Sequence, residues 1–351
     1  MFRKLILFPF TAVYALALYA RHFAYDCGIL KSELAALPTL VLGNIHLGGT
    51  GKTPHASAFL QLFSEKLGGP EYVALLSRGY KRSTKGFALV NLKENWTEFG
   101  DEPTLLKSMH PLNPIAVCED RLSGVEEIKR QHPQVKLVIL DDGLQHRSLR
   151  PHKSLLLIDA RRPLKKECLF PSGNLRDLKT RSERFDAWII SRDSMADEKE
   201  VQKSTTRVRP VFSSRMLSGT SIHTPEGAVL KNIRPSVLVV CGIAQPHNFI
   251  DELQKDWEVI SIKTYSDHHR FSEKQVEEWV GIMKDHELDA IITTCKDAVR
   301  IYPLITTYPH ITLVSIPIKV EWTDKDAINN WVDKWLESPI FAIQNKNNEH
   351  T

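Results

Sequence analysis

The chain reads Gly43-Asn44-Ile45-His46-Leu47-Gly48-Gly49-Thr50-Gly51-Lys52-Thr53-Pro54 at the point that decides its fold. This stretch follows the apolar run Leu37–Leu42, which is typical of a short buried strand, and precedes His55–Lys66, where apolar residues recur at helical spacing. A strand, a glycine-rich turn, Gly-Lys-Thr and a helix form the context that a phosphate-binding loop requires. In such a loop the backbone N–H groups turn toward a phosphate, and the helix N-terminus adds partial positive charge. The stretch therefore predicts a nucleotide-binding α/β fold.

Within this loop we expect Lys52 to reach the β- and γ-phosphates of a nucleotide and Thr53 to offer its hydroxyl to Mg²⁺. His46 stands where the strict G-x-x-x-x-G-K-[ST] pattern has its first glycine, so a literal search misses the loop. The loop alone leaves open a glycine-rich turn with an incidental lysine. The residues expected to bind the nucleotide are His46, Leu47, Gly48, Gly49, Thr50, Gly51, Lys52 and Thr53.

The composition describes a folded globular protein, because 42% of its 351 residues are hydrophobic and 25% are charged. This length is sufficient for two domains. A net charge of +4 does not call for nucleic acid, although it suits an anionic ligand or a membrane surface. The five cysteines are scattered without C-x-x-C spacing, which argues against a disulfide framework or a zinc site and favours a reducing compartment.

The N-terminus carries Arg3-Lys4, an apolar run over Leu5–Ala20, and Arg21-His22. A secretory signal has this form, but export would carry a nucleotide-binding loop into a compartment without ATP. A spanning helix needs about 20 apolar residues, and this run is shorter and contains Pro9. We prefer a helix that lies in the membrane interface, with aromatic residues at the headgroup boundary and basic residues near anionic lipid. A helix buried against the domain remains the alternative.

A second nucleotide-site signal is the apolar run Val135–Leu140, which leads directly into Asp141-Asp142. Apolar residues that end in aspartate have the form of a Walker B strand, which places a carboxylate beside Mg²⁺. Two adjacent carboxylates at one strand end are costly unless a cation neutralises them. We therefore prefer a metal site to the alternative of a polar turn.

Other apolar runs alternate with helical patterns, which predicts a parallel sheet flanked by helices on both faces. Polar residues and Pro210 interrupt the pattern near 205–214, and a second, smaller α/β unit begins with Val237–Cys241. The predicted fold is thus a P-loop NTPase-like sheet, a smaller α/β domain and an N-terminal membrane-associated helix. The predicted divisions are residues 1–25 for this helix, 26–212 for the P-loop domain, 213–340 for the smaller domain and 341–351 for a polar tail.

Two further motifs carry titratable side chains. Gly100-Asp101-Glu102-Pro103 opens a helix, where Asp101 could simply be a cap. In Asp267-His268-His269 the adjacent histidines would point to opposite faces of a strand, so they rarely share a metal ion. A general base or its partner is the better interpretation of one of them.

Taken in chain order, these motifs resemble those of one family, the tetraacyldisaccharide 4′-kinases of Gram-negative bacteria. Each motif alone is weak, but the ordered set extends from the N-terminal helix to the last helix. The matching signatures are the loop Gly43–Pro54, Ser77-Arg78-Gly79-Tyr80, Gly100-Asp101-Glu102, Asp141-Asp142-Gly143-Leu144-Gln145-His146, Gly173-Asn174-Leu175-Arg176, Asp267-His268-His269-Arg270-Phe271 and Lys296-Asp297-Ala298.

The resemblance implies transfer of the ATP γ-phosphate to the 4′-hydroxyl of an acylated glucosamine disaccharide 1-phosphate, giving lipid IVA. Such a substrate lies in the inner membrane, so the enzyme would be a peripheral protein on the cytoplasmic face. The partners implied are this lipid and the membrane surface, with no nucleic acid and no obligate protein partner. The open alternatives are a soluble P-loop small-molecule kinase or NTPase with a packed N-terminal helix, and a nucleotide-gated membrane adaptor.

The resemblance also implies roles for individual residues. Asp101 would accept the hydroxyl proton with His268 as its partner, while Asp142 and Arg176 would complete the catalytic set. The implied Mg²⁺ site is Thr53, Asp141, Asp142 and the nearby Gln145, and the implied substrate contacts are Asn44, Arg78, Arg121 and His146.

Two positions depart from the family pattern. Asp177 stands where the family usually has Glu, which should matter little if the role is capping. Cys295 replaces the usual Glu of a Thr-Glu-Lys-Asp motif, so we expect Lys296 and Asp297 to fix the loop rather than to act in the reaction.

Overall fold

The structure is a computed structural model that describes residues 2–93, 95–162, 164, 167–191, 208–219, 221–222, 234–243 and 246–341. The predicted polar tail therefore lies almost entirely outside the described residues. The helices are α1 (Phe2–Asp26), α2 (Lys52–Leu67), α3 (Asp101–Met109), α4 (Arg121–Gln131), α6 (Pro246–Leu253), α7 (Glu273–Asp285), α8 (Cys295–Ile305) and α9 (Lys325–Leu336).

In the described part of the chain the larger sheet has nine strands in the order β16-β10-β9-β8-β2-β6-β3-β5-β4. Its interior pairs are parallel, as predicted, and only the edge pairs β10–β16 and β4–β5 are antiparallel. The strands are β2 (Thr39–Gly43), β3 (Val73–Ser77), β4 (Ala88–Leu89), β5 (Ile115–Val117), β6 (Leu137–Asp141), β8 (Lys153–Asp159), β9 (Ala187–Ser191), β10 (Val211–Ser218) and β16 (Ile318–Trp322).

The phosphate-loop strand β2 lies between β6 and β8, at the centre of this sheet. All five residues of β2 and all five of β6 are buried, because helices cover both faces of the sheet. The carboxyl end of β6 therefore delivers Asp141 beside the loop that follows β2. A separate pair of short strands, β1 (Glu33–Leu34) and β7 (Leu149–Arg150), joins the segment after α1 to the segment before β8.

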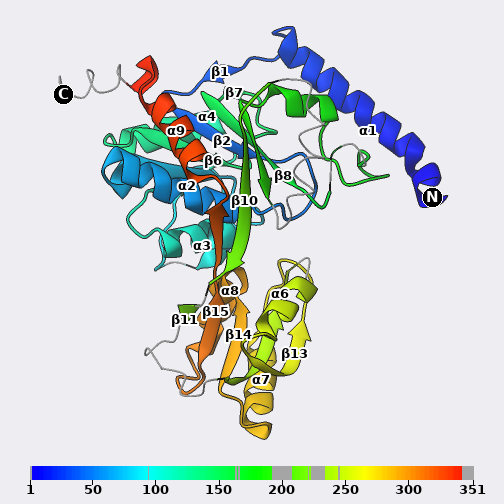
Figure 1. Cartoon of the computed structure of the whole chain (residues 1–351), viewed down its shortest axis with the longest axis vertical. Coiled ribbons are helices and arrows are strands. Elements are labelled where there is room, and N and C mark those ends of the chain that lie inside the picture. The colour runs from blue at the N-terminus through cyan, green and yellow to red at the C-terminus, as the bar shows by residue number, and fades with distance from the viewer. Residues whose placement is uncertain are drawn as a thin grey trace.

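The smaller sheet has the order β11-β15-β14-β12-β13 within the described residues. Figure 1 shows this unit below the larger one, with α6, α7 and α8 around its strands. Its strands are β11 (Ser221–Ile222), β12 (Ser236–Cys241), β13 (Glu258–Thr264), β14 (Ala290–Thr294) and β15 (Leu313–Ile316).

The sheets require a correction to the predicted domain boundaries. Residue 212 lies inside β10, and the chain returns to the larger sheet through β16, which pairs antiparallel with β10. The last helix, α9, then packs Trp335 against Phe63 of α2, with the ring centroids 5.6 Å apart. The smaller unit is thus an insertion between β10 and β16, and the predicted segment 213–340 includes parts of the larger core.

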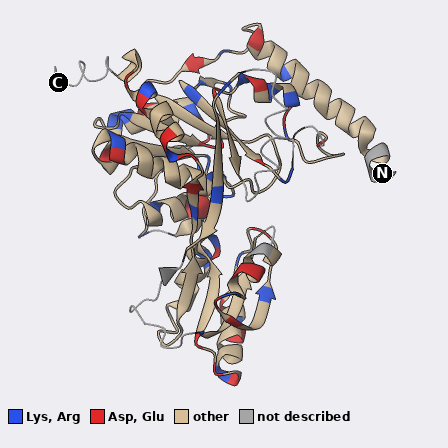
Figure 2. Ribbon diagram, in the orientation of Figure 1, with Lys and Arg blue, Asp and Glu red and all other residues tan. Residues whose placement is uncertain are grey.

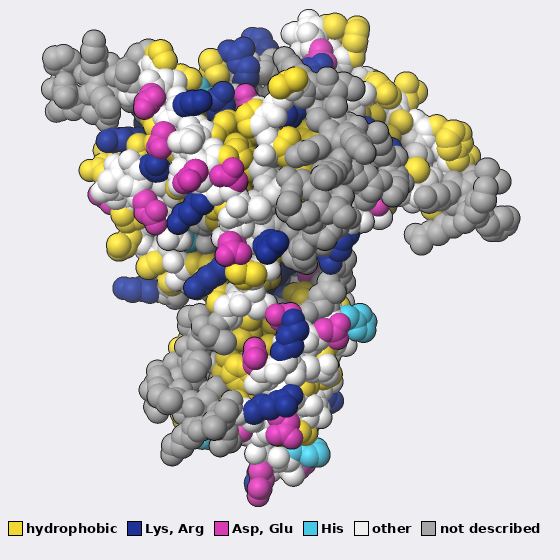
Figure 3. All heavy atoms as spheres, viewed as in Figure 1, with side chains coloured by type: hydrophobic (Ala, Val, Ile, Leu, Met, Phe, Trp, Pro, Cys, Tyr) yellow, Lys and Arg dark blue, Asp and Glu magenta, His cyan; other side chains and the backbone are white. Residues whose placement is uncertain are grey.

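Helix α1 is a single long helix that runs along the outside of the larger unit (Figure 1). In the described chain, Ile6–Asp26 is long and apolar enough to cross a membrane by length and composition, although the sequence prediction considered the apolar run too short. Only 6% of this segment is buried, so the alternative of a buried helix is not what the structure shows. Figure 3 shows apolar side chains along it, and Phe8, Phe10, Val13, Leu16, Tyr19 and Phe23 are all more than half exposed.

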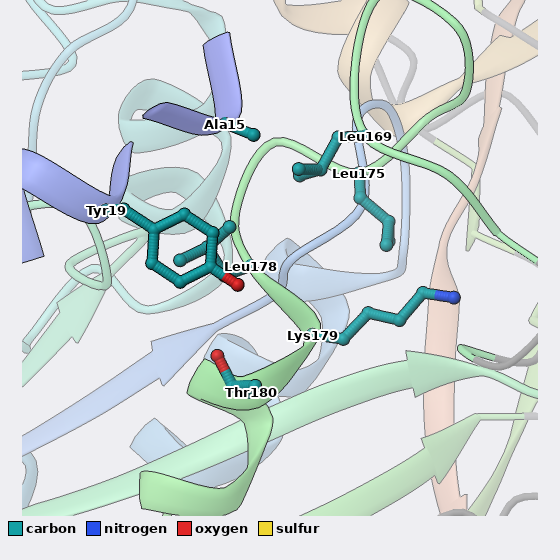
Figure 4. Close-up of a pocket in the computed structure, with 7 residues that line it drawn as sticks. All are labelled: Ala15, Tyr19, Leu169, Leu175, Leu178, Lys179 and Thr180. Atoms are coloured by element: carbon teal, nitrogen blue, oxygen red, sulfur yellow. The ribbon is translucent and has the colours of Figure 1, made fainter. Parts of the chain in front are cut away.

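The inner side of α1 is held by a few polar contacts. Tyr14 donates a hydrogen bond of 2.8 Å to the carbonyl of Arg176, and Thr11 donates one of 2.7 Å to Ser172. A cavity of about 310 Å³ lies between α1 and the segment 169–180 (Figure 4). Tyr19, Leu169 and Leu178 contribute to its largely apolar lining. Charges of both signs are spread over both units, as Figure 2 shows, in line with the small net charge.

Candidate active site

The phosphate loop has the backbone geometry that its glycines predict. Gly48 and Gly51 have φ of 86° and 80°, values that L side chains rarely adopt, and α2 begins directly after Gly51. A side chain at Gly51 would also come within 2.8 Å of the sulfur of Met216 in β10. The loop tip at 47–49 is exposed, whereas Thr50 is buried. The tip is therefore accessible while its two ends are fixed.

The interior of the loop is organised by Asn44. Its amide donates to the carbonyl of His46 at 3.0 Å and to the hydroxyl of Thr50 at 2.8 Å. Its side-chain oxygen accepts a hydrogen bond of 3.1 Å from Lys52. The side chain of this predicted substrate contact is thus bonded within the protein, where it shapes the loop.

A second segment braces the loop from outside. Arg176 N–H donates to the carbonyl of Ile45 at 2.8 Å, and Leu47 N–H donates to that of Asn174 at 2.7 Å. His46 lies under this brace with 1% of its surface exposed, and burial lowers its pKa to about 4, so the ring is neutral at pH 7. Only the backbone of His46 can therefore face a nucleotide.

Lys52, Asp142 and Arg176 form a charged cluster at the base of the loop. Lys52 Nζ lies 3.7 Å from Asp142 Oδ2, and Arg176 Nη1 donates to the same oxygen at 2.9 Å. Arg176 also binds Asp142 Oδ1 and donates from Nε to the carbonyl of Asn44 at 3.1 Å. Burial opposes ionisation of Asp142, but the Arg176 hydrogen bond and the charge of Lys52 hold its pKa below the ordinary value. The cluster is therefore ionic.

Asp141 is in a different electrostatic position. Burial and the nearby negative charge of Glu102 raise its pKa to about 7, against the opposing charge of Lys52. Within the described residues its Oδ1 is buried without a hydrogen-bond partner. A divalent cation would supply the missing positive charge, so this carboxylate fits the predicted metal site.

The other predicted metal ligands do not form a compact group around Asp141. Across the described ranges no group of three or more His, Cys, Asp and Glu side chains is placed to hold a metal ion. Gln145 is exposed, and its carbonyl accepts a hydrogen bond from Arg21. Magnesium usually takes one or two carboxylates and completes its shell with phosphate oxygens and water, which Asp141 and Thr53 would allow here.

The structure brings Asp101 and His268 together across the two units. Asp101 is the first residue of α3 and is buried, and His268 Nδ1 lies 2.9 Å from its Oδ2. Burial opposes ionisation of Asp101, but the hydrogen bond from His268 and the charge of Lys296 hold its pKa below the ordinary value. Arg300 adds a further positive charge, with Nε 3.9 Å from Oδ2. Asp101 is thus a buried carboxylate, not merely a helix cap.

The contacts of Lys296 with this pair were not predicted from the sequence. This residue is the second of α8, and its Nζ lies 3.1 Å from His268 Nε2, 3.4 Å from Asp267 Oδ1 and 3.6 Å from Glu102 Oε1. Asp297 behaves as expected, because it is buried and accepts hydrogen bonds from Gly242 N–H at 3.0 Å and Thr294 at 2.7 Å. A lysine after a strand end carries no local signal of such a contact.

The other predicted substrate residues lie around the start of α4. Arg121 is buried, donates to the carbonyl of Cys118 at 2.8 Å, and feels the charges of both Asp141 and Asp142. His146 Nε2 accepts from the backbone N–H of Arg121 at 3.2 Å, so its ring supports this helix start. Arg78 is exposed and acts electrostatically on Arg121.

Comparison with known proteins gives one consistent result. The family model for tetraacyldisaccharide-1-P 4′-kinase matches residues 3–337. The tetraacyldisaccharide 4′-kinase of Cytophaga hutchinsonii is 30% identical over 100% of this chain and 99% of that protein, and that of Flavobacterium psychrophilum is 32% identical over 86% and 88%. The crystal structure of the "apo" form of LpxK from Aquifex aeolicus in complex with ATP has a TM-score of 0.75 and 26% identity, covering 95% of this chain and 99% of that one.

Proposed function

The chain belongs to the tetraacyldisaccharide-1-P 4′-kinase family, and it is a kinase of tetraacyldisaccharide 1-phosphate, a precursor of lipid A. We propose a mechanism for this reaction in which Asp101 is the base. The reaction transfers the γ-phosphate of ATP to the 4′-hydroxyl of tetraacyldisaccharide 1-phosphate, giving lipid IVA. The observation that carries the mechanism is the contact of buried Asp101 with His268, and the neighbouring Glu102 acts electrostatically on Asp141 beside the phosphate loop. The comparisons do not favour the alternative of a soluble small-molecule kinase.

On the nucleotide side, Lys52 and the loop amides hold the β- and γ-phosphates. Asp141 and Thr53 would hold Mg²⁺, with Asp142 and Gln145 as further members of the predicted set, and the bound ion would neutralise charge on the phosphates. The guanidinium groups of Arg121 and Arg78 are the donors for phosphate oxygens, because a planar fork suits bidentate binding. Arg176 contributes its positive charge while it binds Asp142. Asn44 and His146 act through the loop and α4 that they support.

On the acceptor side, Asp101 takes the proton of the 4′-hydroxyl as the oxygen attacks phosphorus. Its ionised form is ready at neutral pH because His268, Lys296 and Arg300 stabilise the negative charge. His268 comes from the smaller unit and Asp101 from the larger one, so approach of the two units completes the pair.

Helix α1 accounts for access to a lipid substrate. Its apolar outer face suits the interface of the inner membrane on the cytoplasmic side, with the enzyme bound as a peripheral protein. The cavity under α1 offers apolar side chains to a hydrocarbon chain of the substrate. The function needs no nucleic acid and no obligate protein partner.

The test is transfer of ³²P from labelled ATP to tetraacyldisaccharide 1-phosphate in mixed micelles. Labelled lipid IVA from the wild type, with losses of about 100-fold or more in both Asp101→Ala and Lys52→Ala, is the expected result. The control is Lys255→Ala, which removes an exposed lysine of the smaller unit that forms an ion pair with Glu252. No transfer by a wild type that binds ATP would overturn the acceptor assignment. Full activity of Asp101→Ala would overturn its role as base.

A further inference from the structure

The cationic end of Lys296 lies where the Asp101–His268 pair crosses from one unit to the other. Its side chain is 21% exposed, and its Nζ is 3.1 Å from the imidazole nitrogen that Asp101 does not use. We propose that Lys296 is a positioning residue of the kinase reaction, which fixes the tautomer of His268 and holds the ring against Asp101. This inference rests on the proposed roles of Asp101 and His268.

The hydrogen-bond chemistry of the three side chains leaves one arrangement. An ammonium group has donors but no acceptor, so His268 Nε2 must accept from Lys296. The ring proton is then on Nδ1 and is donated to Asp101 Oδ2 across 2.9 Å. Asp101 therefore keeps an acceptor for the hydroxyl proton, and His268 steers the carboxylate without taking that proton from it. In the other tautomer two acceptors, Nδ1 and the carboxylate, would face each other.

Backbone geometry gives a reason why the imidazole needs external support. His268 has φ of 59°, a left-handed conformation that is uncommon for residues with side chains. The ring is flanked by Tyr80 at a centroid distance of 5.5 Å and by Asp267 Oδ2 at 3.9 Å. Neither of these groups can replace the donor that Lys296 gives to Nε2, because the carboxylate only accepts and the tyrosine approaches through its ring.

Lys296 also connects the units by charge. Its Nζ is 3.6 Å from Glu102 of α3 in the larger unit and 3.4 Å from Asp267 of the smaller unit. The ammonium group of Lys296 thus lies near a carboxylate of each unit. It does so beside the Asp101–His268 pair, whose hydrogen bond requires that the two units are aligned. Arg300 Nε also lies 3.9 Å from Asp101 Oδ2, but its guanidinium is already bound to Asp297.

The test compares Lys296→Met, which keeps the length of the side chain without its donors, with Lys296→Arg, which restores a cationic donor. We expect Lys296→Met to lower kcat about 10- to 100-fold while KM for ATP changes less than about 3-fold, since Lys296 does not touch the phosphate loop. Lys296→Arg should recover part of this loss. Lys255→Ala is the control, because it removes an exposed lysine of the same unit.

Two readouts separate positioning from a merely structural effect. In a His268→Ala background, Lys296→Met should cause little further loss, because its action passes through the imidazole. Loss of the cation also raises the pKa of Asp101, so the acidic limb of the kcat/KM profile should move to higher pH in Lys296→Met and not in Lys255→Ala. Unchanged thermal unfolding and ATP binding would show that the variant is folded.

The outcomes distinguish this inference from the function on which it rests. If His268→Ala and Asp101→Ala keep full activity, the proposed base mechanism fails first. If those variants lose activity but Lys296→Met does not, the positioning role of Lys296 is wrong. It is also wrong if the loss of activity in the Lys296→Met, His268→Ala double variant equals the product of the losses in the two single variants.

Discussion

The guanidinium of Arg176 binds both carboxylate oxygens of Asp142, a residue 34 positions earlier in the chain, with Nη1 2.9 Å from Oδ2. The resemblance to the family implied that Arg176 and Asp142 belong to the catalytic set and that Asp142 is also a metal ligand. In the structure each side chain neutralises the other, and Lys52 Nζ lies 3.7 Å from the same oxygen, Asp142 Oδ2. This relationship makes Arg176 a structural part of the nucleotide site.

We therefore predict that Arg176→Ala lowers kcat by about 100-fold, because it removes a preorganised positive charge and frees the carboxylate of Asp142. Arg176→Lys should recover only part of the activity, since an ammonium cannot bind a carboxylate in a bidentate manner. Steady-state kinetics across a Mg²⁺ titration is the measurement. Arg130→Lys, at an exposed ion pair with Glu127, is the control. Equal activity of Arg176→Lys and wild type would rule out the bidentate requirement.

The contact between His22 and Asp177 attaches α1 to the segment that carries Arg176. Arg147 donates to His22 Nδ1 at 3.2 Å, so the ring proton is on Nε2 and is donated to Asp177 Oδ1 at 2.7 Å. Both side chains are buried, and losing one partner should cost about 1–3 kcal/mol. We predict that His22→Ala lowers the free energy of unfolding by this amount in urea titrations in detergent. Asp256→Ala, at an exposed aspartate, should leave the free energy of unfolding nearly unchanged. A similar loss of stability in both variants would contradict the role of the His22–Asp177 contact.

Acidic substitutions on the outer face of α1 should weaken membrane binding. Val13 and Leu16 are each 69% exposed on a helix with few buried residues. A carboxylate at either position would have to enter the apolar boundary, so Val13→Glu and Leu16→Glu should each lower partitioning to anionic vesicles roughly tenfold. Vesicle flotation measures this, with Leu112→Glu as control because Leu112 is 74% exposed in the loop after α3. Equal binding of all three variants would exclude α1 as the docking element.

Acid should destabilise the fold through His55, which joins α2 to β10. Its Nδ1 donates to the Gly51 carbonyl at 2.7 Å, its Nε2 accepts from Ser214 at 2.8 Å, and burial lowers its pKa to about 4. In the unfolded chain the ordinary pKa is about 6.5, so between these values the unfolded state holds more protons. The stabilisation is complete above about pH 7 and falls as the pH drops toward 4, by at most about 1.4 kcal/mol per pH unit for this group.

Urea unfolding of wild type and His55→Gln at pH 7.5 and pH 5 tests this. The difference in the free energy of unfolding between pH 7.5 and pH 5 should be smaller in the variant than in the wild type. It should not disappear, because burial also lowers the pKa of His46 to about 4. A pH dependence identical to that of the wild type would show that His55 does not contribute.

Much of the larger unit could be predicted from local pattern. The apolar run before the glycine-rich loop, the loop itself and the helix after it are contiguous, and their conformations depend on neighbouring residues. The strands β10 and β16 were missed, although Ile318–Trp322 alternates apolar and polar residues. Their pairing joins residues about a hundred positions apart, and polar residues around Pro210 indicated a boundary there. Local patterns do not reveal that a chain leaves one sheet and later returns to it.

The site divides in the same way. Local motifs were sufficient to predict the phosphate loop and the Walker B aspartates, because their chemistry depends on residue type and spacing, whereas the pairing of Asp101 with His268 was expected only from the family resemblance. Which of these side chains face one another depends on the tertiary structure. It assigned Asn44 to the interior of the loop, tied Arg176 to Asp142, and brought Lys296 to His268. Such contacts depend on strand order and on how the two units pack, since a charged side chain finds its partner through the whole fold.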